Sequence, residues 1–294
     1  MATRFALIIE PTASDDSRID YSASFTQVDA SAPALSVGEL STQRGDGIFE
    51  SIGVIDRHPQ EVAAHLERFV RSAEICDLPV PNVEQWRQAI DAAAALCGPG
   101  EWVVKTILSR GVDHGPTPTA WVTAADAADF SRPRREGIAV VTLDRGFDLN
   151  APARAPWLLL GAKTLSYAVN MASLREAHKR GADDAIFVSS DGFVLEAPTA
   201  SVILRIGDVF VTPEPTGGIL HGTTQLSAFA WLEEQGYTTA YRDVRTSELA
   251  VADAGWLVSS VRLAAPVRRI DEADVPLDHE LTDALNAYLL SPRD

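Results

Sequence analysis

The chain has 294 residues, of which 46% are hydrophobic and 22% charged, which is an ordinary globular composition. A chain of this length is too long for one small hydrophobic core. The formal net charge of −16 at pH 7 argues against a nucleic acid or an anionic membrane as partner, because an acidic surface repels both. No stretch approaches the roughly 20 apolar residues that span a bilayer, and the apolar run at 5–9 is too short for a signal peptide, so we expect a soluble, cytoplasmic protein.

The first third of the chain alternates strand and helix patterns. Residues 4–10 and 47–56 are strand candidates, the second with partial alternation of apolar side chains. Residues 61–78 and 83–97 have the apolar spacing of amphipathic helices. The glycines and proline of 98–100 end the second of these helices.

A change of composition indicates a domain boundary. Residues 101–111 and 119–124 are expected to form a pair of strands, and the polar, proline-containing segment 126–136 then has the character of an interdomain linker. We therefore predict a smaller N-terminal α/β domain at 1–125 and a larger C-terminal α/β domain at 137–294.

The predicted second domain is rich in short strands. Residues 137–143 and 155–160 are strand candidates, and 169–180 has helical periodicity. Turn residues separate a further set of short strands, expected as an antiparallel meander at 184–190, 193–197, 201–206 and 208–213. A helix at 224–237, a strand at 238–244 and a strand-like segment at 255–271 follow.

These elements predict an α+β fold of two mixed domains rather than a doubly wound nucleotide-binding fold. The chain contains no GxGxxG motif after a strand, no P-loop and no GxSxG elbow. Cys76 and Cys97 are too few for a disulfide framework or a zinc site, and we expect free thiols. The six histidines show no ligand spacing, so no metal is expected.

Lysine is scarce, and one lysine stands in an unusual place. Only Lys105, Lys163 and Lys179 occur, and Lys163 falls between the apolar segment 155–160 and the predicted helix 169–180. Desolvation there would penalise an ammonium ion. The lysine could reach water, form a salt bridge or take part in chemistry, and these alternatives stay open on local sequence.

Two further sites place charge inside regular elements. Glu196 lies in a run of strand residues, where a buried carboxylate needs a cation, a donor or a pyridinium as partner. An edge-strand glutamate in solvent explains it equally well. His65, Arg68 and Arg71 recur at spacings of three and so share one face of the predicted helix. On local sequence, a charged face exposed to solvent is enough to explain them.

Polar residues also mark two later segments. Gly222, Thr223 and Thr224 begin a predicted helix, which is either an ordinary capped start or a phosphate-binding one. Ser260 and Arg262 interrupt an apolar segment, either at a bend with exposed amides or at a strand end.

In this order, the segments resemble the fold-type IV pyridoxal-phosphate enzymes, a family that includes branched-chain aminotransferases, D-amino-acid aminotransferases and 4-amino-4-deoxychorismate lyases. The matching motifs are RGDGIFES, HLERFVRSA, GAKTLSYAVN, FVLEAPTASV, GILHGTT and SSVRLAAPV. The resemblance covers about residues 5–270 and implies a D-amino-acid-aminotransferase-like fold, pyridoxal 5′-phosphate as cofactor and a homodimer.

The resemblance also implies roles for single residues. Lys163 matches the lysine that binds the cofactor covalently and moves protons, and Glu196 matches the carboxylate that pairs with the pyridinium nitrogen. Arg68 matches a phosphate-binding arginine, and Tyr167 a tyrosine near the cofactor O3′. The phosphate would also meet hydroxyls and amides of Gly222, Thr223, Thr224 and Ser260.

Within the family, the chain looks most like 4-amino-4-deoxychorismate lyases, which release pyruvate and 4-aminobenzoate, a folate precursor. The segment after the lysine lacks a pattern of branched-chain enzymes, and His221 stands where proline or arginine is commoner. An aminotransferase is the main alternative, and a catalytically silent binding protein a weaker one. We expect Arg110, the 111–117 loop and Arg262 at the substrate pocket, although both arginines could serve structural salt bridges.

Overall fold

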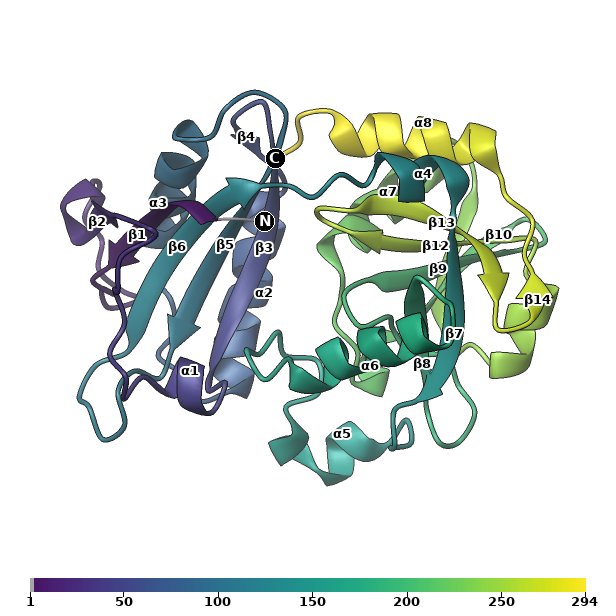
Figure 1. Cartoon of the computed structure of the whole chain (residues 1–294), viewed down its shortest axis with the longest axis horizontal. Helices are drawn as coiled ribbons and strands as arrows, with labels where there is room; N and C mark the ends of the chain where they lie inside the picture. Colours follow the sequence, from purple (N-terminus) through teal and green to yellow (C-terminus); the bar gives the residue numbers. More distant parts are fainter. Residues whose placement is uncertain (1–2) are drawn as a thin grey trace. The chain divides into compact units, whose positions relative to one another are not determined.

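The computed structural model describes residues 3–294, which form two compact units (Figure 1). The first unit comprises Met1–Ala128, Ala162–Tyr167 and Pro292–Asp294. The second comprises Asp129–Gly161 and Ala168–Ser291.

The first unit is built on a six-stranded antiparallel sheet with the order β2-β1-β6-β5-β3-β4. Its strands are β1 (Thr3–Ile9), β2 (Phe25–Val28), β3 (Gly47–Ile55), β4 (His58–Pro59), β5 (Glu101–Ser109) and β6 (Thr119–Asp126). The short helices η1 (Ser22–Ser24) and α1 (Leu40–Gln43) lie in its connections. Every strand expected from the sequence in this part of the chain is present, and β1 and β3 begin within one residue of the predicted positions.

Helices α2 (Val62–Ile75) and α3 (Val83–Ala95) pack on this sheet, α2 on β3 and α3 on β1, β5 and β6 (Figure 1). Both were expected from their apolar spacing. Residues Leu66, Phe69 and Ala73 of α2 recur at i, i+3 and i+7 and are all buried. Phe69 meets Trp86 of α3 edge to face with ring centroids 4.9 Å apart, so the two helices share one core.

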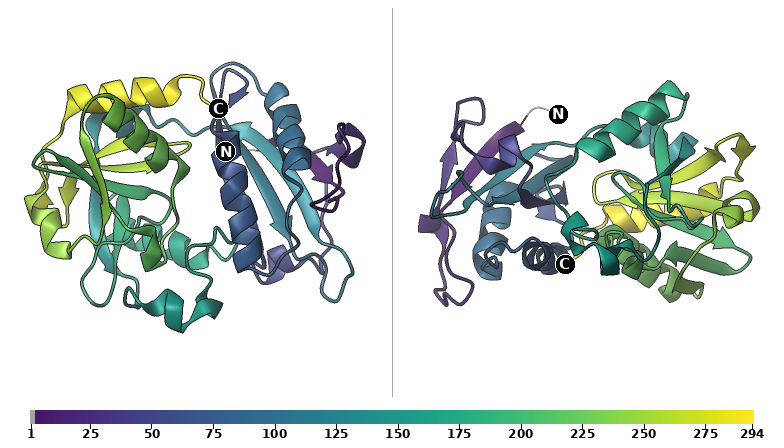
Figure 2. Two further views of the ribbon diagram at one scale, coloured as in Figure 1. Left: turned by 180° about the vertical axis from the view of Figure 1, so that it is seen from behind. Right: turned by 90° about the horizontal axis from the view of Figure 1, so that it is seen from below.

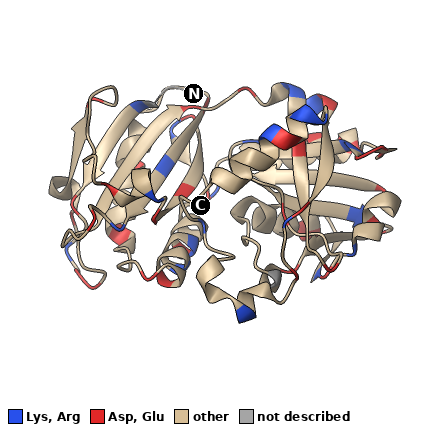
Figure 3. Cartoon of the chain, turned by 60° about the horizontal axis from the view of Figure 1, so that its bottom comes forward, with Lys and Arg blue, Asp and Glu red and all other residues tan. Residues whose placement is uncertain are grey.

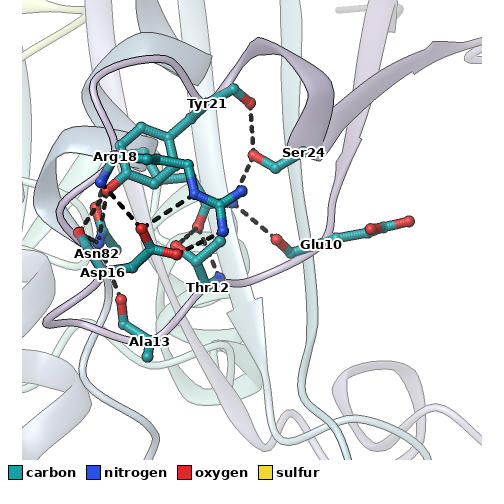
Figure 4. A network of polar contacts seen from close by, with 9 residues as sticks. Glu10, Thr12, Ala13, Asp16, Arg18, Tyr21, Ser24 and Asn82 are labelled. Atoms are coloured by element: carbon teal, nitrogen blue, oxygen red, sulfur yellow. Dashed lines mark hydrogen bonds and ion pairs between the residues drawn. The ribbon is translucent and has the colours of Figure 1, made fainter.

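A side-chain network fixes the long connection between β1 and β2 to the start of α3 (Figure 4). Asn82 accepts a hydrogen bond from the Gln85 amide as N-cap, and its Nδ2 donates to the carbonyls of Ala13 and Asp16. The Tyr21 hydroxyl donates to the Asp16 carbonyl at 2.6 Å. Because Tyr21 and Asn82 are buried, these bonds order a connection that has no regular structure for most of its length.

The predicted division of the chain at residues 126–136 differs from the contacts in two respects. Residues Ser131–Glu136 form helix α4, which packs on β13 (Leu263–Ile270) and α8 (His279–Leu290) of the second unit rather than acting as a free linker. The lysine segment Ala162–Tyr167 clusters with the first unit, although it was expected in the C-terminal domain. It does so because it pairs with β3, a contact between positions more than a hundred residues apart.

The second unit contains an eight-stranded mixed sheet with the order β11-β10-β9-β12-β13-β7-β8, to which β14 adds beside β13. The strands are β7 (Ile138–Asp144), β8 (Asp184–Val188), β9 (Ser201–Ile206), β10 (Val209–Pro213), β11 (Thr238–Arg242), β12 (Ala254–Ser259), β13 (Leu263–Ile270) and β14 (Ala273–Asp274). The predicted meander holds only for β9 and β10, because β8 pairs in parallel with β7.

Two other predicted strands are wrong in this unit. Residues 155–160 contain the short 3-10 helix η2 (Pro156–Leu158), and Trp157 is 75% exposed, so this apolar stretch is no buried strand. Residues 193–197 form a loop with isolated bridges at Phe193 and Val194. The strand-like segment 255–271 is present as two antiparallel strands, β12 and β13, and the chain turns between them at 260–262, where a bend or a strand end was predicted.

The remaining helices are α5 (Ala151–Arg154), α6 (Ala168–Lys179), η3 (Pro215–Gly217), α7 (Thr223–Glu234), η4 (Thr246–Val251) and α8 (His279–Leu290). Helices α7 and α8 contact each other, and α6 packs on β7 and β8 (Figure 2). Along β9, Ile203 joins the core under α7 and α8, whereas Val202 and Leu204 join a second core on the opposite face.

Charged residues lie on helices, strands and loops of both units (Figure 3). Among residues 3–294, no helix is long and apolar enough to cross a membrane. The same residues contain no cluster of histidine, cysteine, aspartate and glutamate that could hold a metal ion.

Both cysteines are free and buried, and burial raises the pKa of Cys76 and of Cys97 to about 11. Because a thiolate is the reactive form, roughly one thiol in a thousand is reactive at pH 8. We expect an aromatic disulfide reagent to leave the native protein unlabelled and to label two thiols in denaturant. Labelling of the native protein at the denatured rate would contradict this expectation.

Candidate functional site

Lys163 is anchored in the first unit by its backbone. Its N–H donates to Ser72 Oγ at 3.1 Å, and its carbonyl accepts from the Phe49 N–H at 3.0 Å. Its Nζ lies 4.6 Å from the centroid of the Phe49 ring. The lysine is half-buried, so helix α2 and strand β3 fix its main chain while the side chain lies over an aromatic face.

Tyr167 contacts the same aromatic ring. The rings of Phe49 and Tyr167 meet edge to face with centroids 5.3 Å apart. The structure therefore brings together Lys163 and Tyr167 through Phe49, a residue that the sequence did not single out. The feature of the sequence that could have identified Phe49 is its position in the RGDGIFES motif.

The turn before β3 depends on glycine. Gly45 has φ of 68°, which favours glycine, and a Cβ at Gly47 would stand 2.7 Å from the Leu108 carbonyl oxygen. Arg110 closes this turn, since its Nε donates to Asp46 at 2.7 Å. Its other two nitrogens donate to the carbonyls of Cys76 and Asp77, so its three guanidinium nitrogens all have protein partners.

Arg68 belongs to a buried ionic cluster and not to a solvated face. Its Nε and Nη2 donate to the two carboxylate oxygens of Glu50 at 2.8 and 2.7 Å. His65 Nδ1 lies 2.8 Å from Glu50 Oε2. Glu50, His65 and Arg68 are 1%, 0% and 7% exposed, whereas Arg71 points to solvent. Glu50 was not predicted, because a strand glutamate beside an HxxR helix is informative only once the two elements are known to pack.

The charge of this cluster is balanced internally. Burial alone would raise the pKa of Glu50, but the Arg68 charge and the hydrogen bonds from Arg68 and His65 hold it far below its ordinary value. Glu50 is therefore ionised, and its negative charge compensates the guanidinium of Arg68.

In the second unit, Glu196 lies in the loop after β8. Its carbonyl accepts from the Phe187 N–H at 2.8 Å, and its Oε2 accepts from the Leu220 N–H at 3.1 Å. It is half-buried, which differs from a solvent-exposed edge glutamate. The 3.1 Å bond ties this carboxylate to the segment that leads into α7.

A group of hydroxyls surrounds the start of α7. The Ser260 Oγ lies 3.4 Å from Thr223 Oγ1 and 3.2 Å from Thr224 Oγ1. Gly222 is the N-cap, so no side chain caps the first amides of the helix. Both threonines are buried. Hydroxyl donors and the first amides of a twelve-residue helix are a donor set that suits a phosphate.

Arg262 is nearly buried in the same unit and is only partly satisfied. Its Nη1 donates to Asp184 Oδ2 at 2.6 Å, and 11% of its side chain is exposed. Its Nε and Nη2 are buried and have no hydrogen-bond partner within residues 3–294. Because buried donors are rarely left unpaired, these two nitrogens mark a place for an acceptor.

The predicted site residues thus form two groups. Lys163, Arg68, Tyr167 and Arg110 belong to the first unit. The residues of the second unit are Glu196, Gly222, Thr223, Thr224, Ser260 and Arg262.

Comparison with known proteins gives consistent similarities. A family model described as amino-transferase class IV matches residues 47–270. A bifunctional aminodeoxychorismate lyase / D-amino acid transaminase of Mycobacterium tuberculosis is 41% identical, over 89% of this chain and 95% of the relative. The fold IV-transaminase CpuTA1 of Curtobacterium pusillum is 47% identical with a TM-score of 0.93, over 98% of this chain and 99% of that one. The PLP-bound form of a hypothetical aminotransferase from Mycobacterium tuberculosis is 38% identical with a TM-score of 0.87, over 91% and 97%.

The Glu50 cluster predicts a pH-dependent stability. We expect Glu50→Gln to lower the free energy of unfolding at pH 7 by about 3 kcal/mol, because Arg68 keeps its charge and loses its counter-ion. The folded-state pKa of Glu50 lies below its ordinary value of 4.5, so its contribution is complete above that value and declines as the pH falls from there towards the folded-state value.

Chemical denaturation of both proteins at pH 7, 5.5 and 3.5 measures this contribution. The difference between wild type and variant should be equal at the two higher values and smaller at pH 3.5. A difference that stays constant over the whole range would contradict the assignment of an ionised Glu50.

Proposed function

Because the chain belongs to the class IV aminotransferase family, we propose that it is a 4-amino-4-deoxychorismate lyase, which eliminates pyruvate from its substrate and forms 4-aminobenzoate. The family membership shows the predicted α+β fold of fold-type IV transaminases, pyridoxal 5′-phosphate as cofactor and an enzyme of lyase or transaminase type. The observation that supports the lyase is the 41% identity to a relative whose name includes that activity.

The cofactor would be held by residues of both groups described above. When bound, pyridoxal phosphate supplies an electron sink for negative charge that develops at the carbon bearing the amine. Lys163 would carry the cofactor covalently, and its Nζ would then move the proton at that carbon. Glu196 would accept a hydrogen bond from the pyridinium N–H and so keep the ring protonated.

The phosphate would be bound by Arg68 and by the hydroxyls at the start of α7. Thr223 and Thr224 each place a hydroxyl within 3.4 Å of the Ser260 hydroxyl, and no side chain caps the start of the helix, where an anion would bind. Tyr167 would lie near the cofactor O3′, held by its contact with Phe49.

Arg262 is the better of the two arginines for a substrate carboxylate. The nitrogens of Arg110 are used by Asp46 and by two carbonyls, whereas Arg262 has two buried donors without a partner in the part of the chain that the structure describes. 4-Amino-4-deoxychorismate carries two carboxylates, and a guanidinium fork matches a carboxylate with two parallel hydrogen bonds. A homodimer and a role in making a folate precursor follow as further expectations of this proposal.

A D-amino-acid transaminase is the second candidate, because the name of the same relative includes that activity. Both reactions need the lysine, the carboxylate and the phosphate donors, so these residues do not separate them. The pocket for the rest of the substrate has to make the difference.

Product analysis of the purified holoenzyme tests the lyase. With 4-amino-4-deoxychorismate we expect pyruvate and 4-aminobenzoate in equal amounts, and with D-alanine and 2-oxoglutarate little amino-group transfer. Lys163→Ala should lose both the absorption band of the bound cofactor and the turnover, because no amine then holds the cofactor. Efficient amino transfer without pyruvate release would refute the lyase.

The role of Arg262 predicts a specific kinetic change. We expect Arg262→Lys to raise the KM for 4-amino-4-deoxychorismate by about tenfold with a smaller effect on kcat, because a lysine cannot make two parallel bonds to a carboxylate. Arg205→Lys is the matched control, since Arg205 pairs with Asp278 at 2.6 Å in the same unit. Equal effects of the two substitutions on KM would argue that Arg262 is only structural.

A further inference from the structure

Glu50 of β3 holds one edge of the Arg68 guanidinium. The Nε and Nη2 atoms of Arg68 lie 2.8 and 2.7 Å from the two oxygens of the same carboxylate, a bidentate pair. His65, one helical turn before Arg68, contacts Glu50 Oε2 at 2.8 Å. The carboxylate is thus bound by two side chains of α2 and is itself carried by a strand inside the sheet.

This arrangement removes the freedom that an arginine side chain ordinarily has. An arginine loses up to about 2 kcal/mol of rotamer entropy when it is immobilised. Arg68 loses this entropy when the protein folds, because its partner Glu50 is held in place. Glu50 is 1% exposed and lies on a strand that pairs with β5 along its full length. A preorganised donor binds an anion more tightly than a mobile one, because no further ordering is needed.

The same two elements carry the backbone of Lys163. Phe49, the neighbour of Glu50, donates to the Lys163 carbonyl, and Ser72, four residues after Arg68, accepts from the Lys163 N–H. The pair of Glu50 and Arg68 therefore joins the strand and the helix that fix the lysine. Its loss would act on the guanidinium directly and on the lysine main chain only through packing.

We propose that Glu50 is a positioning residue for the cofactor phosphate: it fixes the Nε–Nη2 edge of Arg68 and so sets the orientation in which the guanidinium meets the phosphate. The inference rests on the proposed role of Arg68 in phosphate binding. Glu50 itself does not contact the cofactor in this proposal. Its loss should weaken recognition of the phosphate more than recognition of the rest of the cofactor.

Binding of pyridoxal phosphate and of pyridoxal to the apoenzyme separates these effects, because the two ligands differ only in the phosphate. Titrations followed by absorbance give both dissociation constants and hence a phosphate preference. We expect Glu50→Gln to reduce this preference by about tenfold, mainly by weakening the binding of pyridoxal phosphate. Circular dichroism and thermal melting of each apoprotein show that the variant is folded under the conditions of the titration.

Glu61→Gln is the matched control. Glu61 is a buried glutamate at the N-cap of the same helix and pairs with Arg293 at 3.2 Å, so its loss also costs stability. We expect it to leave the phosphate preference within about twofold of wild type, because its carboxylate pairs with Arg293 and the bidentate pair of Glu50 and Arg68 is kept. A similar drop in both variants would mean that the effect is general destabilisation, and the proposal would be wrong.

Two further variants keep the outcomes distinct. Arg68→Gln should reduce the phosphate preference at least as much as Glu50→Gln, and no reduction would refute the role of Arg68 itself. A reduction in Arg68→Gln with none in Glu50→Gln would refute only the positioning role. If Glu50→Gln does not fold, Glu50→Asp decides by the same criterion, since it keeps the charge and is too short for the bidentate pair.

Discussion

One buried ion pair, between Glu50 and Arg68, sets the local structure on which the first unit's candidate site depends. A carboxylate that is 1% exposed is tolerated only when its charge and its lone pairs are met, and both requirements are satisfied from α2. The packing depends on the same contacts, because α2 can lie on β3 only with Arg68 and His65 facing that strand. Since Phe49 and Ser72 lie on the same two elements, the position of the Lys163 main chain follows from the same packing.

The second unit meets a related constraint with hydroxyls and amides in place of charges. The start of α7 buries Thr223 and Thr224 against Ser260 and has a glycine as N-cap. Such a site attracts an anion by short-range donors and by the helix dipole, and it carries no formal charge. In a protein with a net charge of −16, neutral donors and a compensated arginine would allow an anionic group to bind at this proposed site.

The strands and amphipathic helices with clear periodicity could be predicted from the sequence, and so could the order of the family motifs. The errors fall where tertiary contacts decide. The apolar segment 155–160 looked buried, yet Trp157 is largely exposed because the chain there forms a short 3-10 helix. Lys163 was expected in the C-terminal domain but belongs to the first unit. The pairing of its segment with β3 joins positions too distant for any local pattern to reveal. Glu50 escaped notice for the same reason.

The two arginines expected at the substrate pocket show how structure separates residues that look alike in sequence. Arg110 directly follows β5 and Arg262 directly precedes β13, and each pairs with an aspartate, at 2.7 and 2.6 Å. The other two guanidinium nitrogens of Arg110 donate to two backbone carbonyls, so Arg110 stabilises the turn that precedes β3. Arg262 keeps two buried donors without an acceptor among the described residues, and burial makes such donors costly unless a ligand meets them. A lyase and a transaminase of this family would share every donor to the cofactor, so a residue of this second kind, directed at the remainder of the substrate, is where their specificity has to differ.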